Sequence, residues 1–145
     1  MQQWVYDGVD VYSKRMPAHI QLHITEIQAG GRRARGSVEA AREKEAEKLL
    51  KEAANADLTI AMDETGKAFN SLELAAELQE WLHHVPHVAL LIGGPDGLTQ
   101  GCKNKADRLW SLSKLTLPHG LVRVVLTEQL YRAWTILQGH PYHRS

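Results

Sequence analysis

The chain has 145 residues, a length that allows one domain with a hydrophobic core and leaves little room for a second. Its 17 Lys and Arg residues balance 17 Asp and Glu residues, which argues against binding of nucleic acid by bulk charge but leaves a local basic face possible. Because the chain has no bilayer-length apolar run, no secretory signal and no second cysteine to pair with Cys102, we expect a cytoplasmic protein without a membrane partner.

The first part of the chain predicts a helix, a strand and a second helix. Apolar residues at helical spacing predict a helix over residues 2–15, which Pro17 ends. Apolar and polar residues then alternate over residues 20–25, the pattern of a half-buried strand. A longer helix is expected to start at a Ser37 cap and to run to about Ala54.

A basic loop flanked by glycines precedes that second helix, at residues 29–36. Its guanidinium groups either remain solvated or pair with phosphates, whose oxygens match the arginine fork. The arginines concerned are Arg32, Arg33 and Arg35.

A short apolar run over residues 58–62 predicts a buried strand, followed by a turn at Gly66 and Lys67. Asp63 and Glu64 follow this strand, but adjacent strand residues point to opposite sides and cannot form a facing acid–base pair, so we expect a solvated turn. The next helix is expected from a Ser71 cap through Leu82, and its inner side is Leu72, Leu74, Leu78 and Trp81.

The remainder predicts a strand over 87–92, a short helix over 99–108, a brief strand over 109–112, a loop over 113–118 and a helix over 119–138. Apolar positions cover more than one side of this last helix, which indicates an intersubunit contact. Strands that alternate with helices predict one α/β domain over residues 1–145, with a mainly parallel sheet flanked by helices.

The strand over 87–92 ends at three glycines and a proline, Gly93, Gly94, Pro95 and Gly97. This is neither a dinucleotide fingerprint nor a phosphate loop, because neither glycine pattern is complete. Two interpretations stay open. The segment is a structural turn, or it is a site where backbone groups meet a ligand beyond the carboxyl end of a strand.

Histidine spacing does not support a metal site. A proline separates His83 from His87, and His140 and His143 have no carboxylate beside them. The tail over 139–145 combines aromatic, imidazole and guanidinium groups, which can stack on bases and bind phosphates. The alternative is that Tyr142 only packs the tail against its neighbours.

Five segments in fixed order resemble the RlmH family, whose members methylate N3 of a pseudouridine in 23S ribosomal RNA of the large subunit. The resemblance implies the SPOUT class with a C-terminal trefoil (α/β) knot, S-adenosyl-L-methionine as cofactor, a homodimer and action on the assembled ribosome. The segments are residues 91–98, 110–119, 121–126, 128–134 and 140–144.

The resemblance also implies site residues. The cofactor would be bound by Met62, Gly93, Gly94, Leu112, Ser113, Lys114, Leu115, Thr116 and Leu117. Candidates for RNA binding or proton transfer are His119, Arg123, Arg132, Tyr142, His143 and Arg144. The residue that would remove the N3 proton stays unassigned, and no metal is implied.

One departure from the family pattern concerns the start of the chain. Family members begin with a strand ahead of the first helix, and here Met1 enters directly at that helix. We expect this strand to be missing, through a late start codon or truncation, and an uncovered sheet edge to reduce stability. Two other functions remain open: a SPOUT methyltransferase acting on another RNA such as transfer RNA, or a ribosome-associated module without catalysis.

Overall fold

A computed structural model describes residues 1–27 and 38–144 of the chain. The chain divides into two compact units. The helical unit contains Met1–Thr25, Phe69–Pro86 and Gly120–Ser145, and the sheet unit contains Glu26–Ala68 and His87–His119. Arg32, Arg33, Arg35 and Ser37, for which the sequence predicted a basic loop and a helix cap, lie outside the described residues.

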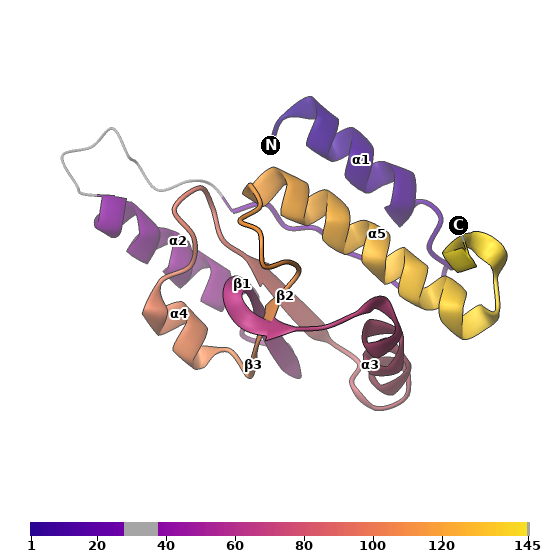
Figure 1. Cartoon of the computed structure of the whole chain (residues 1–145). Helices are drawn as coiled ribbons and strands as arrows, with labels where there is room; N and C mark the ends of the chain where they lie inside the picture. The colour runs from indigo at the N-terminus through magenta and orange to yellow at the C-terminus, as the bar shows by residue number, and fades with distance from the viewer. Residues whose placement is uncertain (28–37, 145) are drawn as a thin grey trace. The chain divides into compact units, whose positions relative to one another are not determined.

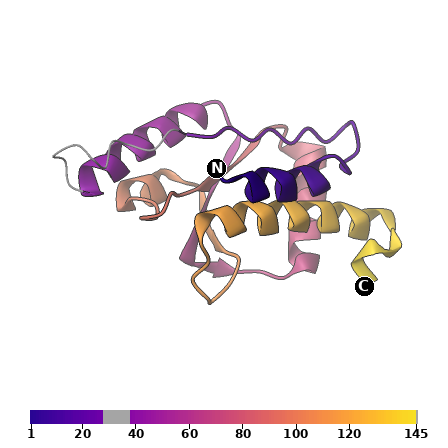
Figure 2. The same cartoon turned by 90° about the horizontal axis from the view of Figure 1, so that it is seen from above.

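In the helical unit, α1 (Gln3–Ser13) runs beside α5 (His119–Gln138) in the same direction, as Figures 1 and 2 show from two sides. Val5 and Val9 lie one helical turn apart and are both buried. Glycines allow the close approach: a Cβ on Gly8 would lie 3.0 Å from Cγ2 of Val124. Helix α1 thus covers part of the apolar surface of α5 within the unit.

The N-cap of helix α3 (Ser71–His84) lies one residue earlier than the sequence predicted. The N-cap is Asn70, whose side chain accepts a hydrogen bond from the backbone N–H of Glu73, while the Glu73 side chain accepts one from the Asn70 N–H. The Ser71 hydroxyl instead donates to Oε1 of Gln129 at 2.6 Å and so links α3 to α5. The sequence also predicted Leu72 on the inner side of this helix, and that prediction is wrong because Leu72 is 68% exposed.

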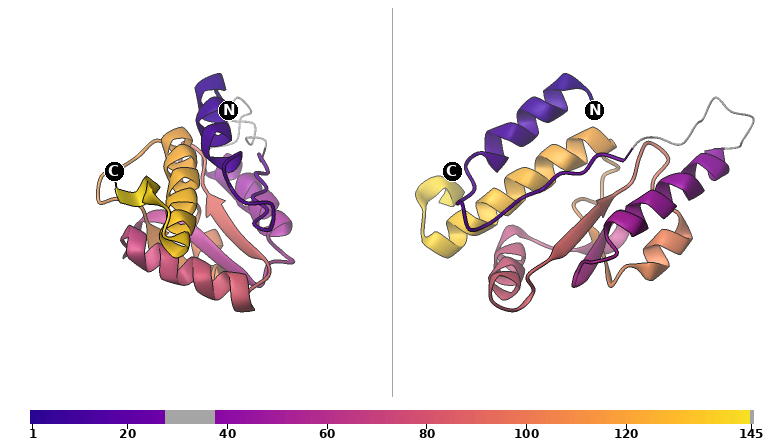
Figure 3. Two further views of the ribbon diagram at one scale, coloured as in Figure 1. Left: turned by 90° about the vertical axis from the view of Figure 1, so that its right-hand side faces the viewer. Right: turned by 180° about the vertical axis from the view of Figure 1, so that it is seen from behind.

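The sheet unit contains a parallel three-stranded sheet in the order β2-β1-β3, which confirms the predicted fold class. The strands are β1 (Leu58–Ala68), β2 (Val88–Ile92) and β3 (Arg108–Ser111). Helices α2 (Val38–Glu52) and α4 (Gln100–Lys105) lie beside each other in this unit (Figure 3).

Alternate strand residues build the core of the sheet unit against these helices. Ala61 is paired in register with Leu91 on one side and with Leu109 on the other, so the three side chains share one face of the sheet. Cys102 of α4 is 1% exposed and packs into the same cluster. Burial raises the pKa of its thiol, so Cys102 is the small apolar filler that its isolation in the sequence indicated.

Two strand predictions need correction. Residues 20–25 form no strand, and Ile24 is 46% exposed. A strand requires a backbone partner, and no strand of the described sheet pairs with this segment. The turn expected at Gly66 and Lys67 is also wrong, because β1 continues to Ala68 and pairs again with β3 at Lys67.

Helix α5 has the bounds that the sequence predicted, and Pro118 precedes its first residue. The short helix α4 ends earlier than expected. Strand β3 both begins and ends one residue earlier than expected, so Leu112 lies outside it. Among the described residues, none of the helices is both long and apolar enough to cross a membrane. The short 3-10 helix η1 (Pro141–Arg144) follows α5 at the end of the chain.

Candidate functional site

Three chain segments that the sequence singled out meet at one edge of the sheet. Met62, the last residue of β1 before the strand leaves its first ladder with β3, is in register with Ile92 at the end of β2 and with Trp110 near the end of β3. Beyond these pairs lie the glycines 93–94, residues 63–66 and residues 112–117. Parallel α/β sheets bind ligands outside the carboxyl ends of their strands, so the sheet unit places all the predicted cofactor residues at such an edge.

Gly93 and Gly94 open a tight turn over residues 93–97, the glycine turn. The Gly97 N–H donates to the carbonyl oxygen of Gly94 at 2.9 Å, and Gly97 has a φ of 77°. A Cβ on Gly93 would lie 2.8 Å from the carbonyl carbon of Gly97, closer than side chains pack. The segment is therefore a tight turn, and its backbone lies beside the end of β2, which leaves the interpretation as a ligand site open.

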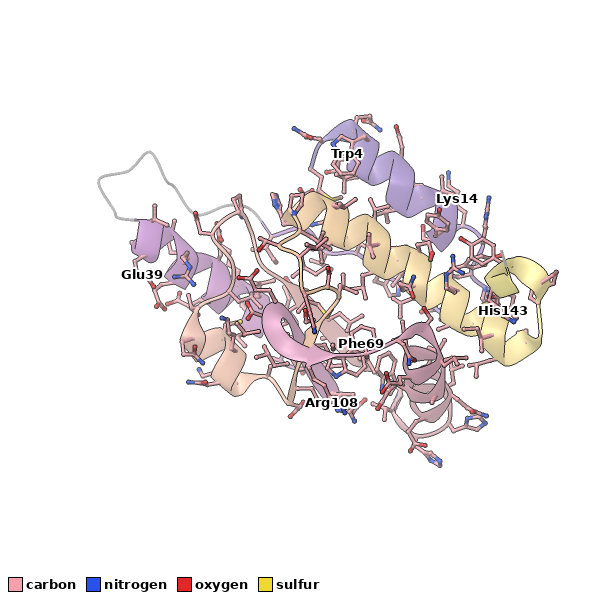
Figure 4. The ribbon with its side chains drawn as sticks, in the orientation of Figure 1. Trp4, Lys14, Glu39, Phe69, Arg108 and His143 are labelled. Atoms are coloured by element: carbon pink, nitrogen blue, oxygen red, sulfur yellow. The ribbon has the colours of Figure 1, made fainter. Side chains whose placement is uncertain are left out.

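Helices α2 and α4 support the segment that follows the glycine turn. A guanidinium nitrogen of Arg42 donates to the carbonyl oxygen of Leu98 at 2.7 Å, and Arg42 also pairs with Glu39, which Figure 4 labels on α2. Thr99 then caps α4 by accepting a hydrogen bond from the Cys102 N–H at 3.1 Å. Both anchors come from the chain's own polar groups and hold the turn against the sheet unit.

Residues 63–66 leave the ladder between β1 and β3, since Met62 and Lys67 are both in register with Trp110. We refer to this segment as the β1 excursion. Gly66 lies directly against β3, where a Cβ would be 2.6 Å from the backbone N and C of Trp110. Only glycine fits between the two strands at this position, which explains the residue that the sequence had assigned to a turn.

Asp63 is not the solvated turn residue that the sequence predicted. Its side chain is 14% exposed, accepts hydrogen bonds from the N–H and hydroxyl of Thr65, and lies 3.3 Å from Nζ of Lys103. Burial alone would raise the pKa of Asp63, but the bonds from Thr65 and Lys103 outweigh it and lower the pKa below its usual value. The carboxylate is therefore ionised and fully engaged, and it joins α4 to the β1 excursion.

The segment over residues 112–117, the β3 loop, is braced by short side-chain bonds. The Ser111 hydroxyl donates to the carbonyl oxygen of Ser113 at 2.8 Å, and Oγ of Ser113 accepts from the Leu115 N–H at 2.9 Å. The Thr116 hydroxyl donates to Oε2 of Glu64 at 2.6 Å. Leu112 and Leu117 are half-buried, whereas Leu115 is 74% exposed. The loop thus combines a fixed backbone with apolar side chains.

The candidates for RNA binding fall into both units. His119 belongs to the sheet unit, and the others lie in the helical unit, at Arg123, Arg132, Tyr142, His143 and Arg144. The side chain of Arg144 lies outside the described part of the structure. The structure therefore brings the cofactor candidates together in one unit and leaves the tail candidates in the other.

The tail packs on α5, as the alternative interpretation of Tyr142 expected. The Tyr142 ring meets the Tyr131 ring edge-on with centroids 4.8 Å apart, and the Arg132 guanidinium lies 5.1 Å from the Tyr142 centroid. Burial raises the pKa of Tyr142, with a smaller effect of the nearby Glu128. A hydrogen bond to Glu128 raises the pKa of Arg132. Arg132 is therefore charged and Tyr142 neutral at neutral pH.

His143 follows directly on this packed segment, and Figure 4 labels it in the final turn beyond α5. Its Nδ1 atom is buried and has no hydrogen-bond partner among the described residues. Buried polar atoms in folded proteins normally have a partner, which makes this atom an exception.

Sequence reasoning missed three contacts at the site, those of Lys103, Glu64 and Gly66. The sequence predicts a short helix around Lys103 and a strand just before Glu64. Neither local signal indicates that these two segments meet. The glycine was the available signal: an isolated glycine within a strand pattern often marks close approach of another backbone.

The family described as "Predicted SPOUT methyltransferase" matches residues 1–143 of the chain. The chain is also similar to curated proteins with the name Ribosomal RNA large subunit methyltransferase H. It is 44% identical over 145 residues to that of Thioalkalivibrio sulfidiphilus, which covers 100% of this chain and 93% of the relative. The same coverage holds for the proteins of Hahella chejuensis, at 45% identity, and Alkalilimnicola ehrlichii, at 47%. The chain therefore belongs to the SPOUT methyltransferase family.

Proposed function

We propose that the protein transfers a methyl group from S-adenosyl-L-methionine to N3 of a pseudouridine in 23S ribosomal RNA, on the assembled ribosome. The names of the similar proteins specify ribosomal RNA of the large subunit as their substrate, and the similarity extends over the whole of this chain. The balanced net charge supports recognition of an assembled particle through local patches rather than of free RNA through bulk charge.

The observation that carries the proposal is the convergence of the three segments at the carboxyl edge of the sheet. The residues there fit the cofactor. The glycine turn offers backbone N–H and C=O groups free of side chains to the polar edge of adenine, and Leu112 and Leu117 offer apolar surface to its faces. Met62, which is 8% exposed, lies in β1 directly before the β1 excursion. Bound in this place, the cofactor would supply an electrophilic methyl group.

The chain's own contribution to methyl transfer is positioning and electrostatics. N3 of the target base carries a weakly acidic proton, which must leave as the new bond to the methyl carbon forms. A permanently charged Arg132 and a neutral Tyr142 can stabilise negative charge that develops on the base or bind phosphate. The raised pKa of Tyr142 argues against its phenolate as the base at neutral pH. The imidazoles of His119 and His143 are the candidates left for accepting the proton.

A homodimer with a C-terminal trefoil knot in each subunit, active in the cytoplasm, completes the proposal. The support for a dimer is the broad apolar surface of α5. Helix α1 covers part of that surface, while Leu121 is still 36% exposed. Light scattering after gel filtration tests the dimer, and a monomeric mass would contradict it.

Methyl transfer from radiolabelled cofactor to isolated components tests the function. Intact ribosomes, free large-subunit RNA and transfer RNA from a strain lacking the gene are compared, and the modified nucleoside is identified by mass spectrometry. We expect label only in ribosomes, at N3 of one pseudouridine. Label in transfer RNA would support the other RNA target. A protein that binds ribosomes without binding the cofactor in a calorimeter would be a module without catalysis.

A further inference from the structure

Glu64 and Thr116 form a hydrogen bond between two of the three segments at the sheet edge. The Thr116 hydroxyl donates to Oε2 of Glu64 at 2.6 Å, across 52 residues of sequence. The acceptor is a carboxylate, and hydrogen bonds to charged acceptors are shorter and stronger than those between neutral groups. Both residues lie in the sheet unit, so the contact belongs to one compact body.

The backbone on both sides of Glu64 is held in place by other parts of the sheet unit. On one side of it, Asp63 is held by Thr65 and by Lys103, whose Nζ lies 3.3 Å from its Oδ1. On the other side, Gly66 is pressed against β3, where a Cβ would lie 2.6 Å from the backbone of Trp110. The β1 excursion therefore has little freedom to move Glu64.

Thr116, by contrast, stands in the less supported half of the β3 loop. The first half is braced by Ser111 and Ser113, and this bracing reaches the N–H of Leu115. Beyond that residue, the bond to Glu64 holds the loop from the side. Leu115 and Leu117 flank Thr116 in the sequence, so a bond that holds Thr116 also restrains the backbone from which these two side chains extend.

We propose that Glu64 is a positioning residue that clamps the β3 loop in the conformation that receives the adenine of the cofactor. The inference rests on the proposed function, since it assigns this loop to the cofactor. A clamp preorganises the loop before binding and reduces the conformational entropy that binding would otherwise cost. Its loss should therefore weaken cofactor binding and leave the RNA side of the reaction unchanged.

Calorimetric titration of S-adenosyl-L-methionine into the full-length protein tests the clamp. The variants are Glu64→Ala, Glu64→Gln, Thr116→Val and the double variant Glu64→Ala/Thr116→Val. The matched control is Glu47→Gln, an exposed carboxylate on α2. We expect Kd to rise about fivefold in Glu64→Ala and in Thr116→Val, and less in Glu64→Gln, which keeps an acceptor oxygen. The double variant should bind no more weakly than either single one, because both remove the same bond.

Steady-state assays on ribosomes separate positioning from general damage to the fold. For Glu64→Ala we expect a higher KM for the cofactor, an unchanged KM for ribosomes and an unchanged kcat at saturating cofactor. Unaltered cofactor affinity in both single variants, or losses that add in the double variant, would overturn the clamp. Absence of binding to the unaltered protein would instead overturn the proposed function. If Glu64→Ala does not fold, Glu64→Gln decides the matter, because Glu64 is not itself a cofactor candidate, and cofactor affinity unchanged in Glu64→Gln would overturn the clamp.

Discussion

The ammonium group of Lys103 lies 3.3 Å from a carboxylate oxygen of Asp63, and both side chains are largely covered, at 19% and 14% exposure. Lys103 belongs to α4, and Asp63 is the first residue of the β1 excursion. The same carboxylate accepts a hydrogen bond from the backbone N–H of Thr65 at 3.1 Å. One ionised group therefore fixes the local shape of the excursion and its position against the helix.

Replacement of Asp63 by Asn should lower the free energy of unfolding by about 1–2 kcal/mol at about pH 7, since bonds to a charged acceptor are lost. The folded-state pKa of Asp63 lies below its usual value of 3.8. The stabilisation is therefore complete above the unfolded pKa and disappears as the pH falls through the folded pKa. Urea denaturation at several pH values should show the difference between the two proteins shrinking below about pH 4.

Asp10→Asn on α1 serves as the control for this effect, because Asp10 is exposed. It should change stability by less than about 0.5 kcal/mol. A difference between Asp63→Asn and the unaltered protein that persists unchanged at the lowest pH would show that the charge of Asp63 does not stabilise the fold.

Gly66→Ala should destabilise the sheet unit by about 2–4 kcal/mol, because the added Cβ would lie 2.6 Å from backbone atoms of Trp110 that cannot rotate away. The comparison is Gly101→Ala in α4, where the nearest atom is 4.0 Å from the new Cβ. Alanine favours the helix there, so this variant should gain up to about 1 kcal/mol. Equal stability of the two variants in urea would contradict the close approach at Gly66.

Asn70→Ala removes one half of the capping box of α3 and leaves the N–H of Glu73 without its acceptor. We expect a loss of about 1 kcal/mol in thermal or urea unfolding. Asn55→Ala, at an exposed position after α2, is the matched control and should be nearly neutral. A similar effect of both substitutions would assign the loss to asparagine removal in general rather than to the cap.

The phenol of Tyr142 should ionise above its usual pKa of 10.0, because burial and the nearby Glu128 both disfavour the phenolate. The difference in absorbance near 295 nm between the unaltered protein and Tyr142→Phe gives its titration as the pH is raised. In concentrated urea the same difference should titrate at the usual pKa, since the packing on Tyr131 is lost. A native midpoint at or below that of the unfolded chain would contradict the packing of the tail.

Local sequence signals were sufficient for most of the elements, whereas the cofactor candidates at the edge of the sheet came from the resemblance to the family. The spacing of apolar residues predicted α5 with its observed bounds, and the glycines after β2 predicted its end. Such signals act over a few residues, through helix periodicity, capping and the backbone freedom of glycine, so they can be found without knowledge of the fold. Such signals can place a helix cap one residue from its true position: Asn70 caps α3, and Ser71, which the sequence predicted, is an equally suitable residue type.

Strand pairing lay beyond these signals. The alternation over residues 20–25 is the pattern of a strand, but a strand exists only where a second backbone accepts its hydrogen bonds. Gly66 appeared to mark a turn because its reason for being glycine lies in β3, far along the chain.

The sequence by itself determined the order and type of most elements, the parallel sheet and the family, because these follow from short-range periodicity and from motifs in fixed order. The tertiary structure alone decided that Asp63 is bound by Lys103 and that Glu64 holds Thr116. Charged and polar side chains have no periodicity that identifies their partners. Their pairing is set by how the backbone brings distant segments together, and in this protein that happens at the carboxyl edge of the sheet.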